Sequence, residues 1–541
     1  MNSTPKIGIG VAFVIAALVI AALSALLMRA PLGDISFLWQ DSYYRHVTQF
    51  SFYQAFLSML LSVGGALPVA LALSRRHFAA KSWIIKIFGT TLVMPVLVGV
   101  FGLLAIYGNS GLVAKWLEHF DFTLPFSIYG LGGILLAHVF FNLPYATRLL
   151  YQSLETIPGE QHKLCAHLGM SAWDKFKWVE WPRLRQQLPS VCGLVFMLCF
   201  TSFATVMALG GGPKSTTIEL AIYQAIKFDF DLQSGALLAM WQMLLCGTLA
   251  LSIQRFAKPL PINGISYRQT QFKGRESMLV RVWDMGVITI TVIFVFSPLL
   301  MVFISGINSA FFKVLADSEF WSALGASLQV AVMSSGLALS AGIAILSTSR
   351  RWRVQDKNRR ANGIEMLGAI ILITPGLVLS TGLFVLLRQF TDVFQLAWLI
   401  VVVVNALMGL PYVIKTLAQP MLHVEQQYQY LCASLGLKGW QRFRVVEWRA
   451  LHKPVAQALS ICFMFAIGDL SAIALFGSQE FKTLPLYLFQ LLGSYQMASA
   501  AVVSVVMLLL SIGVFSLVEW LIKPRKTSII ASNTGLKETT C

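Results

Sequence analysis

The segment LCAHLGMSAWDKFKWVEW at residues 164–181 occurs a second time, without a gap, as LCASLGLKGWQRFRVVEW at residues 431–448. Ten of the eighteen positions are identical, and the two copies are 267 residues apart. The same offset aligns the tripeptide LPY at 143–145 with LPY at 410–412. We therefore predict that the chain consists of two repeated halves, and this repeat determines how the rest of the sequence is divided.

The composition indicates a membrane protein. The chain has 541 residues, of which 57% are hydrophobic and only 12% are charged, and its mean hydropathy is +0.71. Soluble domains carry about 25% charged residues, so this chain could not cover a soluble surface, and a soluble enzyme and a disordered scaffold are both excluded. A membrane span needs about 20 apolar residues, and we predict an all-α polytopic membrane protein with about twelve transmembrane helices. The predicted spans lie near residues 7–28, 52–74, 84–107, 127–148, 189–209, 234–254, 285–306, 326–348, 364–387, 395–415, 456–476 and 499–521.

The basic residues are distributed unequally between the two sides of the predicted membrane. With the N-terminus in the cytoplasm, 33 of the 41 Lys and Arg residues fall in inner segments and 8 in outer segments. Because positive residues concentrate in cytoplasmic loops, both termini are predicted to be cytoplasmic. The net charge of +17 is then a signal of topology, and no nucleic-acid partner is expected.

The division into halves follows from the repeat and the span count. Six spans in each half is an even number, so both halves have the same orientation, and we predict two parallel six-helix repeats. A polar and basic cytoplasmic linker joins them. The predicted boundaries are 1–254 for the first half, with its core at 52–254, 255–283 for the linker, 284–526 for the second half, with its core at 326–522, and 527–541 for a cytoplasmic tail.

Both copies of the strongest repeat lie in inner loops, at 149–188 and 416–455. Gly169 and Gly436 are predicted to end a short helix in each loop, because glycine readily adopts the left-handed conformation of a C-cap. Loops are usually the least constrained part of a repeat. A loop that is kept in both halves therefore indicates a function.

A second helix is predicted after each glycine. In the first copy Ser171 and Asp174 form a capping signal at its start, and Pro182 is predicted to end it. Large apolar residues recur along it at i, i+3 and i+6, beginning at Trp173 in the first copy and at Trp440 in the second. This stripe packs against the ends of the spans in one interpretation. In the other, the exposed side of the loop seats a partner.

The repeated loop resembles the EAA loop of importer-type ABC permeases, in which Glu-Ala-Ala is followed after three residues by glycine and, after nine more, by an Ile-x-Leu-Pro ending. Both copies meet this spacing, although the glutamate that gives the motif its name is absent and Arg449 replaces the final proline of the second copy. The resemblance implies that each loop couples to an ATP-binding subunit, and that the chain seats two such subunits, usually identical. The coupling residues that it implies are Cys165, Ala166, Gly169, Trp173, Glu180 and Pro182 in the first loop and Cys432, Ala433, Gly436, Trp440 and Glu447 in the second.

Longer stretches resemble the permease subunits of the thiamine importers of proteobacteria. They are FFNLPYATRLL at 140–150, IPGEQ at 157–161, CFTSFATVMALGGGPKSTTIELAIYQAIKFDFD at 199–231 and IGDLSAIALFGSQEFKTLPLYLFQ at 467–490. The resemblance implies inward transport of thiamine and its phosphate esters across the bacterial cytoplasmic (inner) membrane, fed by a periplasmic thiamine-binding protein. The alternatives are a fused ferric-iron or polyamine permease and an ion-driven secondary carrier. Ion coupling usually needs several buried ionisable groups, and only one is predicted here.

Asp469 is the one acid that is predicted to lie deep in a span. A carboxylate there costs about 2.5–3.5 kcal/mol on insertion scales, so such residues usually have a function. In one interpretation Asp469 accepts hydrogen bonds from neighbouring helix groups or is protonated. In the other it lines the translocation path and attracts a cation.

Three further residues are candidates for the path. Ser202 is the repeat counterpart of Asp469, and Phe203 and Trp241 have aromatic faces that could attract a cation. The sequence contains no Walker A, HExxH or GxSxG pattern. No catalytic residue, cofactor or metal site is therefore expected, and ATP hydrolysis is assigned to partner chains.

Overall fold

The computed structural model describes residues 7–29, 40–91, 94–122, 127–256, 278–368, 371, 374–437 and 439–522. Every regular element among them is a helix, which confirms the prediction of an all-α protein. Most of the predicted linker and the whole of the predicted tail lie outside the described residues.

The helices of the second half follow the order of those in the first. The first half contains α1 (Ile7–Arg29), α3 (Ser42–Arg75), α4 (Lys81–Thr90), α5 (Val96–Tyr107), α6 (Leu112–Glu118), α7 (Leu131–Glu155), α8 (Gly159–His167), α9 (Ala172–Lys175), the π-helix η2 (Phe176–Glu180), α10 (Trp181–Phe200), α11 (Phe203–Leu209), the 3₁₀-helix η3 (Pro213–Ser215), α12 (Ile218–Lys227) and α13 (Leu232–Phe256). The second half contains α14 (Met278–Gly306), α15 (Phe311–Ala316), α16 (Ser318–Val354), α17 (Asn358–Gly368), α18 (Gly376–Leu387), α19 (Ala397–Ser434), α20 (Gly439–Arg442), the π-helix η5 (Phe443–Glu447), α21 (Trp448–Gly468), α22 (Ser471–Phe476), α23 (Leu484–Gly493) and α24 (Met497–Ile522).

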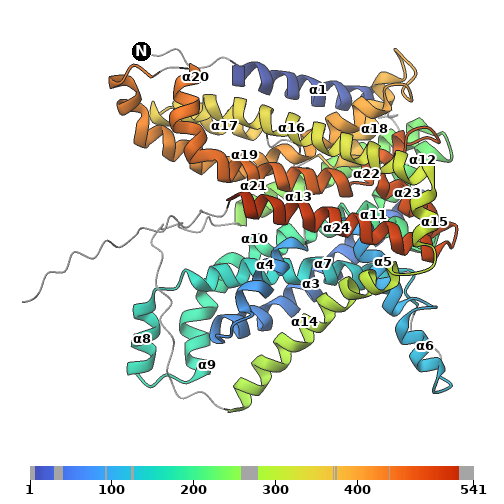
Figure 1. The fold of residues 1–541 in the computed structure, drawn as a ribbon, viewed down its shortest axis with the longest axis horizontal. Helices are drawn as coiled ribbons and strands as arrows, with labels where there is room; N and C mark the ends of the chain where they lie inside the picture. The colour runs from blue at the N-terminus through green and yellow to red at the C-terminus, as the bar shows by residue number, and fades with distance from the viewer. Residues whose placement is uncertain are drawn as a thin grey trace, which may run out of the picture.

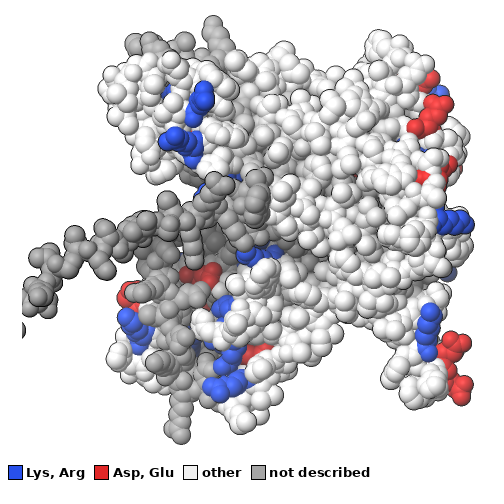
Figure 2. Space-filling model, viewed as in Figure 1, with Lys and Arg blue, Asp and Glu red and all other residues white. Residues whose placement is uncertain are grey.

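Both halves point in the same direction. The helices α8, α9 and α20 lie at one end of the molecule, and α6, α12, α15 and α23 lie at the other (Figure 1). Figure 2 shows that charged side chains gather toward these two ends on the face in view, with a broad uncharged band between them. This distribution is the one that a bilayer imposes on a protein that crosses it.

Ten described helices are long and apolar enough to cross a membrane, and the bent pair Ala172–Phe200 with Phe203–Leu209 raises the number to eleven. The sequence predicts about twelve, and the difference lies at 364–387. This stretch forms two shorter helices, α17 and α18, in place of one span. Pro375 stands at the N-cap of α18, as Pro95 does at the N-cap of α5. Proline cannot donate a backbone hydrogen bond within a helix, so a helix tends to end before it.

The first helix of each half packs against the other half. α1 contacts α16 and α18 of the second half, and α14 contacts α3 and α5 of the first half. Figure 1 shows this exchange: α1 lies beside the helices of the second half at the top, and α14 runs along those of the first half at the bottom. Each of the two helices also keeps a contact with the last helix of its own half, α13 or α24. The two halves are thus interlocked.

Two glycines of the repeat allow the exchanged helices to approach closely. A Cβ atom placed on Gly102 of α5 would lie 2.6 Å from the carbonyl oxygen of Pro298 in α14. A Cβ atom placed on Gly382 of α18 would lie 2.7 Å from the carbonyl oxygen of Ala22 in α1. Both contacts are with backbone, which cannot move aside as a flexible side chain can. Small residues at helix interfaces are the usual way for membrane helices to reach such separations.

We predict that Gly102→Ala and Gly382→Ala each lower the stability of the protein, by about 1–3 kcal/mol, because the added methyl group overpacks the exchanged interface. Thermal unfolding of the purified protein in detergent measures this effect. Gly336→Ala is the matched control, because a Cβ atom there, on α16, meets nothing within 4 Å. Equal unfolding temperatures for Gly382→Ala and Gly336→Ala would contradict the close approach.

Candidate functional site

A cavity of about 380 Å³ lies between the two halves. Its walls come from the beginnings of α5 and α18, from α19, and from the two places where a long helix is interrupted, between α10 and α11 and between α21 and α22. Several of the lining residues are partners in the repeat. Examples are Met197 with Met464 and Ser202 with Asp469, each pair 267 residues apart, and Pro95 with Pro375, the N-cap residues of α5 and α18. A ligand in this cavity would therefore contact both halves.

The interruptions bring backbone and polar side chains to the cavity. α10 ends at Phe200 and α11 begins at Phe203, with a bend of 52° between them. At this break the Thr201 hydroxyl donates a hydrogen bond to the carbonyl of Met197, at 2.9 Å. Non-helical backbone at membrane depth is tolerated where it is buried in protein or lines a water-filled cavity. The two breaks are therefore suited to a polar path through the membrane.

Asp469 lies at the second break, where its carboxylate accepts hydrogen bonds from the start of α22 and also lines the cavity. Its Oδ1 accepts a hydrogen bond from the Ser471 hydroxyl at 2.6 Å and one from the Ser471 backbone N–H at 3.2 Å. Its Oδ2 accepts from the Ala472 N–H at 3.1 Å. The carboxylate therefore caps the beginning of α22, where the helix dipole favours negative charge. It also lines the cavity, so the two interpretations of this residue are compatible.

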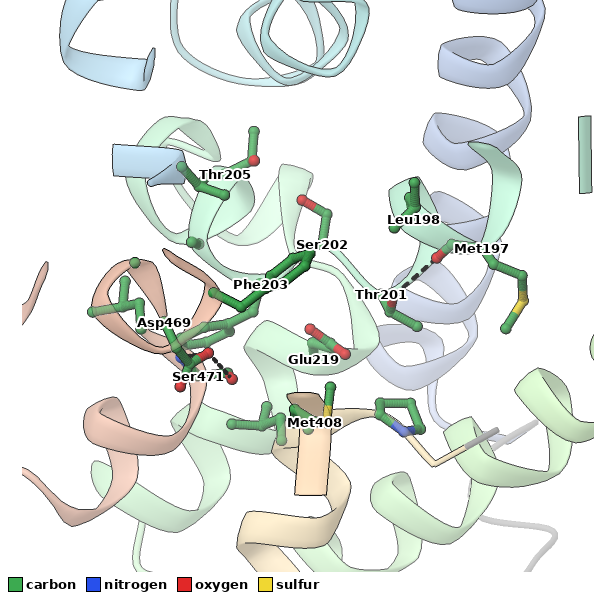
Figure 3. Close-up of a pocket in the computed structure, with 18 of the residues that line it drawn as sticks. Met197, Leu198, Thr201, Ser202, Phe203, Thr205, Glu219, Met408, Asp469 and Ser471 are labelled. Atoms are coloured by element: carbon green, nitrogen blue, oxygen red, sulfur yellow. Dashed lines mark hydrogen bonds between the residues drawn. The ribbon is translucent and has the colours of Figure 1, made fainter. Parts of the chain in front are cut away.

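Glu219 is a second acid at the cavity, and the sequence analysis misses it. It lies in the first turn of α12, is only 3% exposed and lines the cavity (Figure 3). Gln242 of α13 donates a hydrogen bond from Nε2 to Glu219 Oε1 at 3.0 Å. Asp469 is predicted to be the one acid deep in a span, and Glu219, on the short helix α12, is a second buried acid at the same cavity that lies outside the predicted spans. No sequence pattern connects Glu219, in a stretch that reads as an outer segment, with the glutamine of the next span.

The structure brings three of the four predicted path residues together. Asp469, Ser202 and Phe203 line the cavity, and Figure 3 shows them around the same space. Trp241 is not among the lining residues. Its indole N–H donates instead to the Thr48 hydroxyl, at 3.2 Å, between α13 and α3. No lysine, arginine or histidine is found among the described residues that line the cavity.

The repeated loops end their first helix as the sequence predicts. Gly169 and Gly436 have φ angles of +63° and +68°. The N–H of the residue after each glycine donates to the carbonyl of Cys165, at 3.0 Å, or of Cys432, at 2.9 Å. Together with the bonds made by the glycine N–H groups, these contacts form a Schellman motif in both copies. In the second half the helix that ends here is the continuation of α19, whereas in the first half it is the separate helix α8.

The second helix of the first loop begins with the predicted cap but does not end where it was expected to end. The Ser171 hydroxyl accepts a hydrogen bond from the Asp174 N–H, and the Asp174 carboxylate accepts one from the Ser171 N–H. The prediction that Pro182 stops this helix is wrong, because α9, η2 and α10 follow one another without a break. Pro182 lies in the first turn of α10. The π-helix η2 lies directly ahead of it, where the chain already departs from the regular α-helical hydrogen bonds that a proline cannot complete.

Each loop exposes a set of apolar side chains, and the two sets occupy equivalent positions in the repeat. Trp173 is 69% exposed and Trp440 is 72% exposed, whereas Phe176 and Phe443 behind them are partly buried. The exposed sets are Leu164, Leu168 and Trp173 in the first loop and Leu431, Leu435 and Trp440 in the second. We call these sets the docking patches. Apolar residues exposed together in this way mark an interaction site.

The other residues predicted for the coupling loops fall into two classes. Ala166 and Ala433 are exposed beside the docking patches. The neighbouring cysteines, Cys165 and Cys432, are buried. The glutamates that end the two π-helices are also buried, Glu180 almost completely and Glu447 less so.

Comparison with known proteins gives consistent matches over nearly the full length. The family model described as the binding-protein-dependent transport system inner membrane component matches residues 277–526. The chain is 45% identical over 512 residues to the "Thiamine transport system permease protein ThiP" of Escherichia coli (strain K12), covering 95% of both chains. It is 43% identical over 473 residues to the protein of the same name from Haemophilus influenzae, covering 87% of both. A "Sulfate transport system permease protein CysW" from Synechocystis is 24% identical over 190 residues, which is 35% of this chain and 67% of that protein.

Proposed function

The chain belongs to the family of thiamine transport system permease proteins of the inner membrane, and we propose that it is the permease subunit of an ABC importer that carries thiamine and its phosphate esters into the cytoplasm. The observation that carries this proposal is the 45% identity over 95% of both chains. Two separate ATP-binding subunits supply the energy in this proposal, and a periplasmic thiamine-binding protein delivers the substrate. The permease contributes the path and no chemistry of its own.

The cavity between the halves is the proposed site on the path. Thiamine carries a quaternary thiazolium nitrogen, whose positive charge cannot be removed by loss of a proton. Asp469 and Glu219 place two carboxyl groups at the cavity, and an anionic group attracts such a cation more strongly where water is partly excluded. The aromatic side chains of Phe203 and Tyr412 also line the cavity, and aromatic rings attract quaternary ammonium groups through their quadrupoles.

The asymmetry of the cavity supports the choice of a cation. The repeat places Ser202 opposite Asp469 in the alignment, so this position carries an acid in the second half only. The acid of the first half, Glu219, comes from a different element, α12. The described lining has no basic side chain that would neutralise either acid. The cation of the substrate is the proposed neutralising group.

The docking patches are the proposed seats of the ATP-binding subunits. They lie at the end of the molecule where positive residues predominate in the sequence, which is the cytoplasmic side by the positive-inside rule. Two equivalent patches accommodate two equivalent subunits. The opposite end, which carries α12 and α23 (Figure 1), is the proposed face for the binding protein. The proposed halves are 1–254 and 284–526, followed by a tail at 527–541. They are joined by a linker at 255–283, into which the end of α13 and the beginning of α14 extend.

We predict that Asp469→Asn and Glu219→Gln each reduce thiamine uptake by about tenfold to a hundredfold, because a hydrogen-bonded or paired charge contributes about 1.5–3 kcal/mol. Asparagine also caps helices well, so Asp469→Asn removes the charge and retains the cap of α22. Uptake of labelled thiamine in energised cells, normalised to the amount of permease in the membrane, measures the effect. Glu118→Gln is the control, because Glu118 is an exposed acid on α6, outside the cavity. Normal uptake by the double variant would refute the site.

We predict that Trp173→Ala and Trp440→Ala each weaken retention of the ATP-binding subunits by about thirtyfold. Exposed tryptophans at the centre of an interface commonly contribute 2 kcal/mol or more. Co-purification of the ATP-binding subunits with tagged permease measures retention. Trp116→Ala is the matched control, because Trp116 is also exposed, at 63%, but lies on α6 at the opposite end of the molecule. Equal retention by all three variants would show that the patches are not the seats.

A further inference from the structure

We call the repeated loops at 149–188 and 416–455, which carry the docking patches, the docking loops. A buried cluster of charged side chains connects the first docking loop to a helix that is distant in the sequence. Glu180 is the last residue of η2, and its side chain is 2% exposed. Its Oε2 lies 2.9 Å from Nη2 of Arg75, the last residue of α3. Its Oε1 lies 3.1 Å from Nζ of Lys175, at the end of α9. Each oxygen of one carboxylate therefore has its own cationic partner.

The second half repeats this cluster with the same types of group. Glu447 is the last residue of η5, and its Oε1 lies 2.9 Å from Nη2 of Arg350, near the end of α16. The same oxygen lies 3.1 Å from Nε of Arg442 in α20. Both arginines also pair with Glu425 of α19. We call the two clusters the ion clamps: they comprise Arg75, Lys175 and Glu180 in the first half and Arg350, Arg442 and Glu447 in the second.

The clamps connect the docking loops to α3 and α16, which are core helices of their halves. α3 packs along α7 and α10, and α16 packs along α19 and α21. Because a buried ion pair is costly to break one partner at a time, the loop and the end of the core helix will move together. The covalent connection of each loop runs only to the helices that flank it in the sequence.

The first clamp extends to the exchanged helix α14. Asp284 of α14 is 2% exposed, and its Oδ2 lies 2.7 Å from Nη2 of Arg76, the residue after α3. Arg75, which belongs to the clamp, lies 4.0 Å from the other oxygen of Asp284. A displacement of the first loop can thus pass through α3 to a helix of the second half. The second clamp adds Glu425, from its own half.

We propose that the ion clamps are positioning devices that transmit displacement of the docking patches to α3 and α16, and through Asp284 to α14. Glu180 and Glu447 are then positioning residues for transport. The inference rests on the proposed function, since it presupposes that ATP-binding subunits move the loops. The carboxylate at the end of each π-helix then determines how much thiamine is moved per ATP molecule hydrolysed.

The test measures the amount of thiamine moved per ATP hydrolysed by the full complex in proteoliposomes, with the binding protein present. For Glu180→Gln and Glu447→Gln we expect complexes that retain their ATP-binding subunits and hydrolyse ATP but move at least about tenfold less thiamine per ATP. The double variant Arg75→Gln/Glu180→Gln should lower the ratio by less than the product of the two single effects, because both changes remove the Arg75–Glu180 contact.

Glu365→Gln is the matched control. Glu365 of α17 pairs with Arg353 of α16, with Oε2 and Nη2 2.8 Å apart, at the same end of the molecule as the clamps. Neither residue of this pair belongs to a docking loop. This variant should keep the ratio of the unmodified complex. If ion pairs at this end made only a structural contribution, Glu365→Gln would lower the ratio as the clamp variants do.

An unchanged ratio in assembled Glu180→Gln and Glu447→Gln complexes would overturn the inference. If Glu180→Gln does not assemble, Glu180→Asp takes its place, because it keeps the charge and shortens the side chain by one methylene. An unchanged ratio in that variant would overturn the inference equally. An unmodified complex that moves no thiamine would contradict the proposed function itself. Normal transport with an unchanged ratio in the variants would contradict only the positioning role of the ion clamps.

Discussion

The exchange of first helices between the two halves is the constraint on which the rest of the structure depends. α1 is held on α18 at Gly382, and α14 is held on α5 at Gly102, each through contact of a glycine with helix backbone. Each half is thus bound by a helix of the other. The same two helices, α5 and α18, line the cavity with their first residues. Packing between the halves and the shape of the path are therefore parts of one arrangement.

The chemistry of the cavity arises from places where the repeat is broken or unequal. Helix interruptions at equivalent positions expose Ser202 in one half and Asp469 in the other. The backbone symmetry encloses the cavity from both sides, and the departures from symmetry give it two carboxyl groups, on Asp469 and on Glu219 of α12. At the far end the first ion clamp reaches the exchanged helix α14 through Asp284, whereas the described partners of the second clamp come from its own half. At both sites the two halves have matching helices but place their ionisable side chains differently.

Local sequence patterns predict much of this structure, and long-range contacts account for what they miss. The repeat predicts two parallel halves, because it is visible when the sequence is compared with itself. Gly169 and Gly436 predict the two helix ends, because a helix end depends on residues close together in the chain. The exchange of α1 and α14, the pairing of Glu219 with Gln242, and the placement of Trp241 against α3 depend on contacts between distant segments, for which one sequence holds no signal. The stretch 364–387 has the hydropathy of one span, but the chain breaks ahead of Pro375.

We propose that the interlocked halves form the path by which thiamine enters the cell. The decisive measurement is uptake of labelled thiamine at nanomolar concentration, in energised cells with and without the gene. Deletion is expected to abolish uptake, and the intact gene is expected to restore it. Unchanged uptake after deletion, in cells without another thiamine importer, would contradict the assignment of the substrate, although the architecture would remain that of a permease.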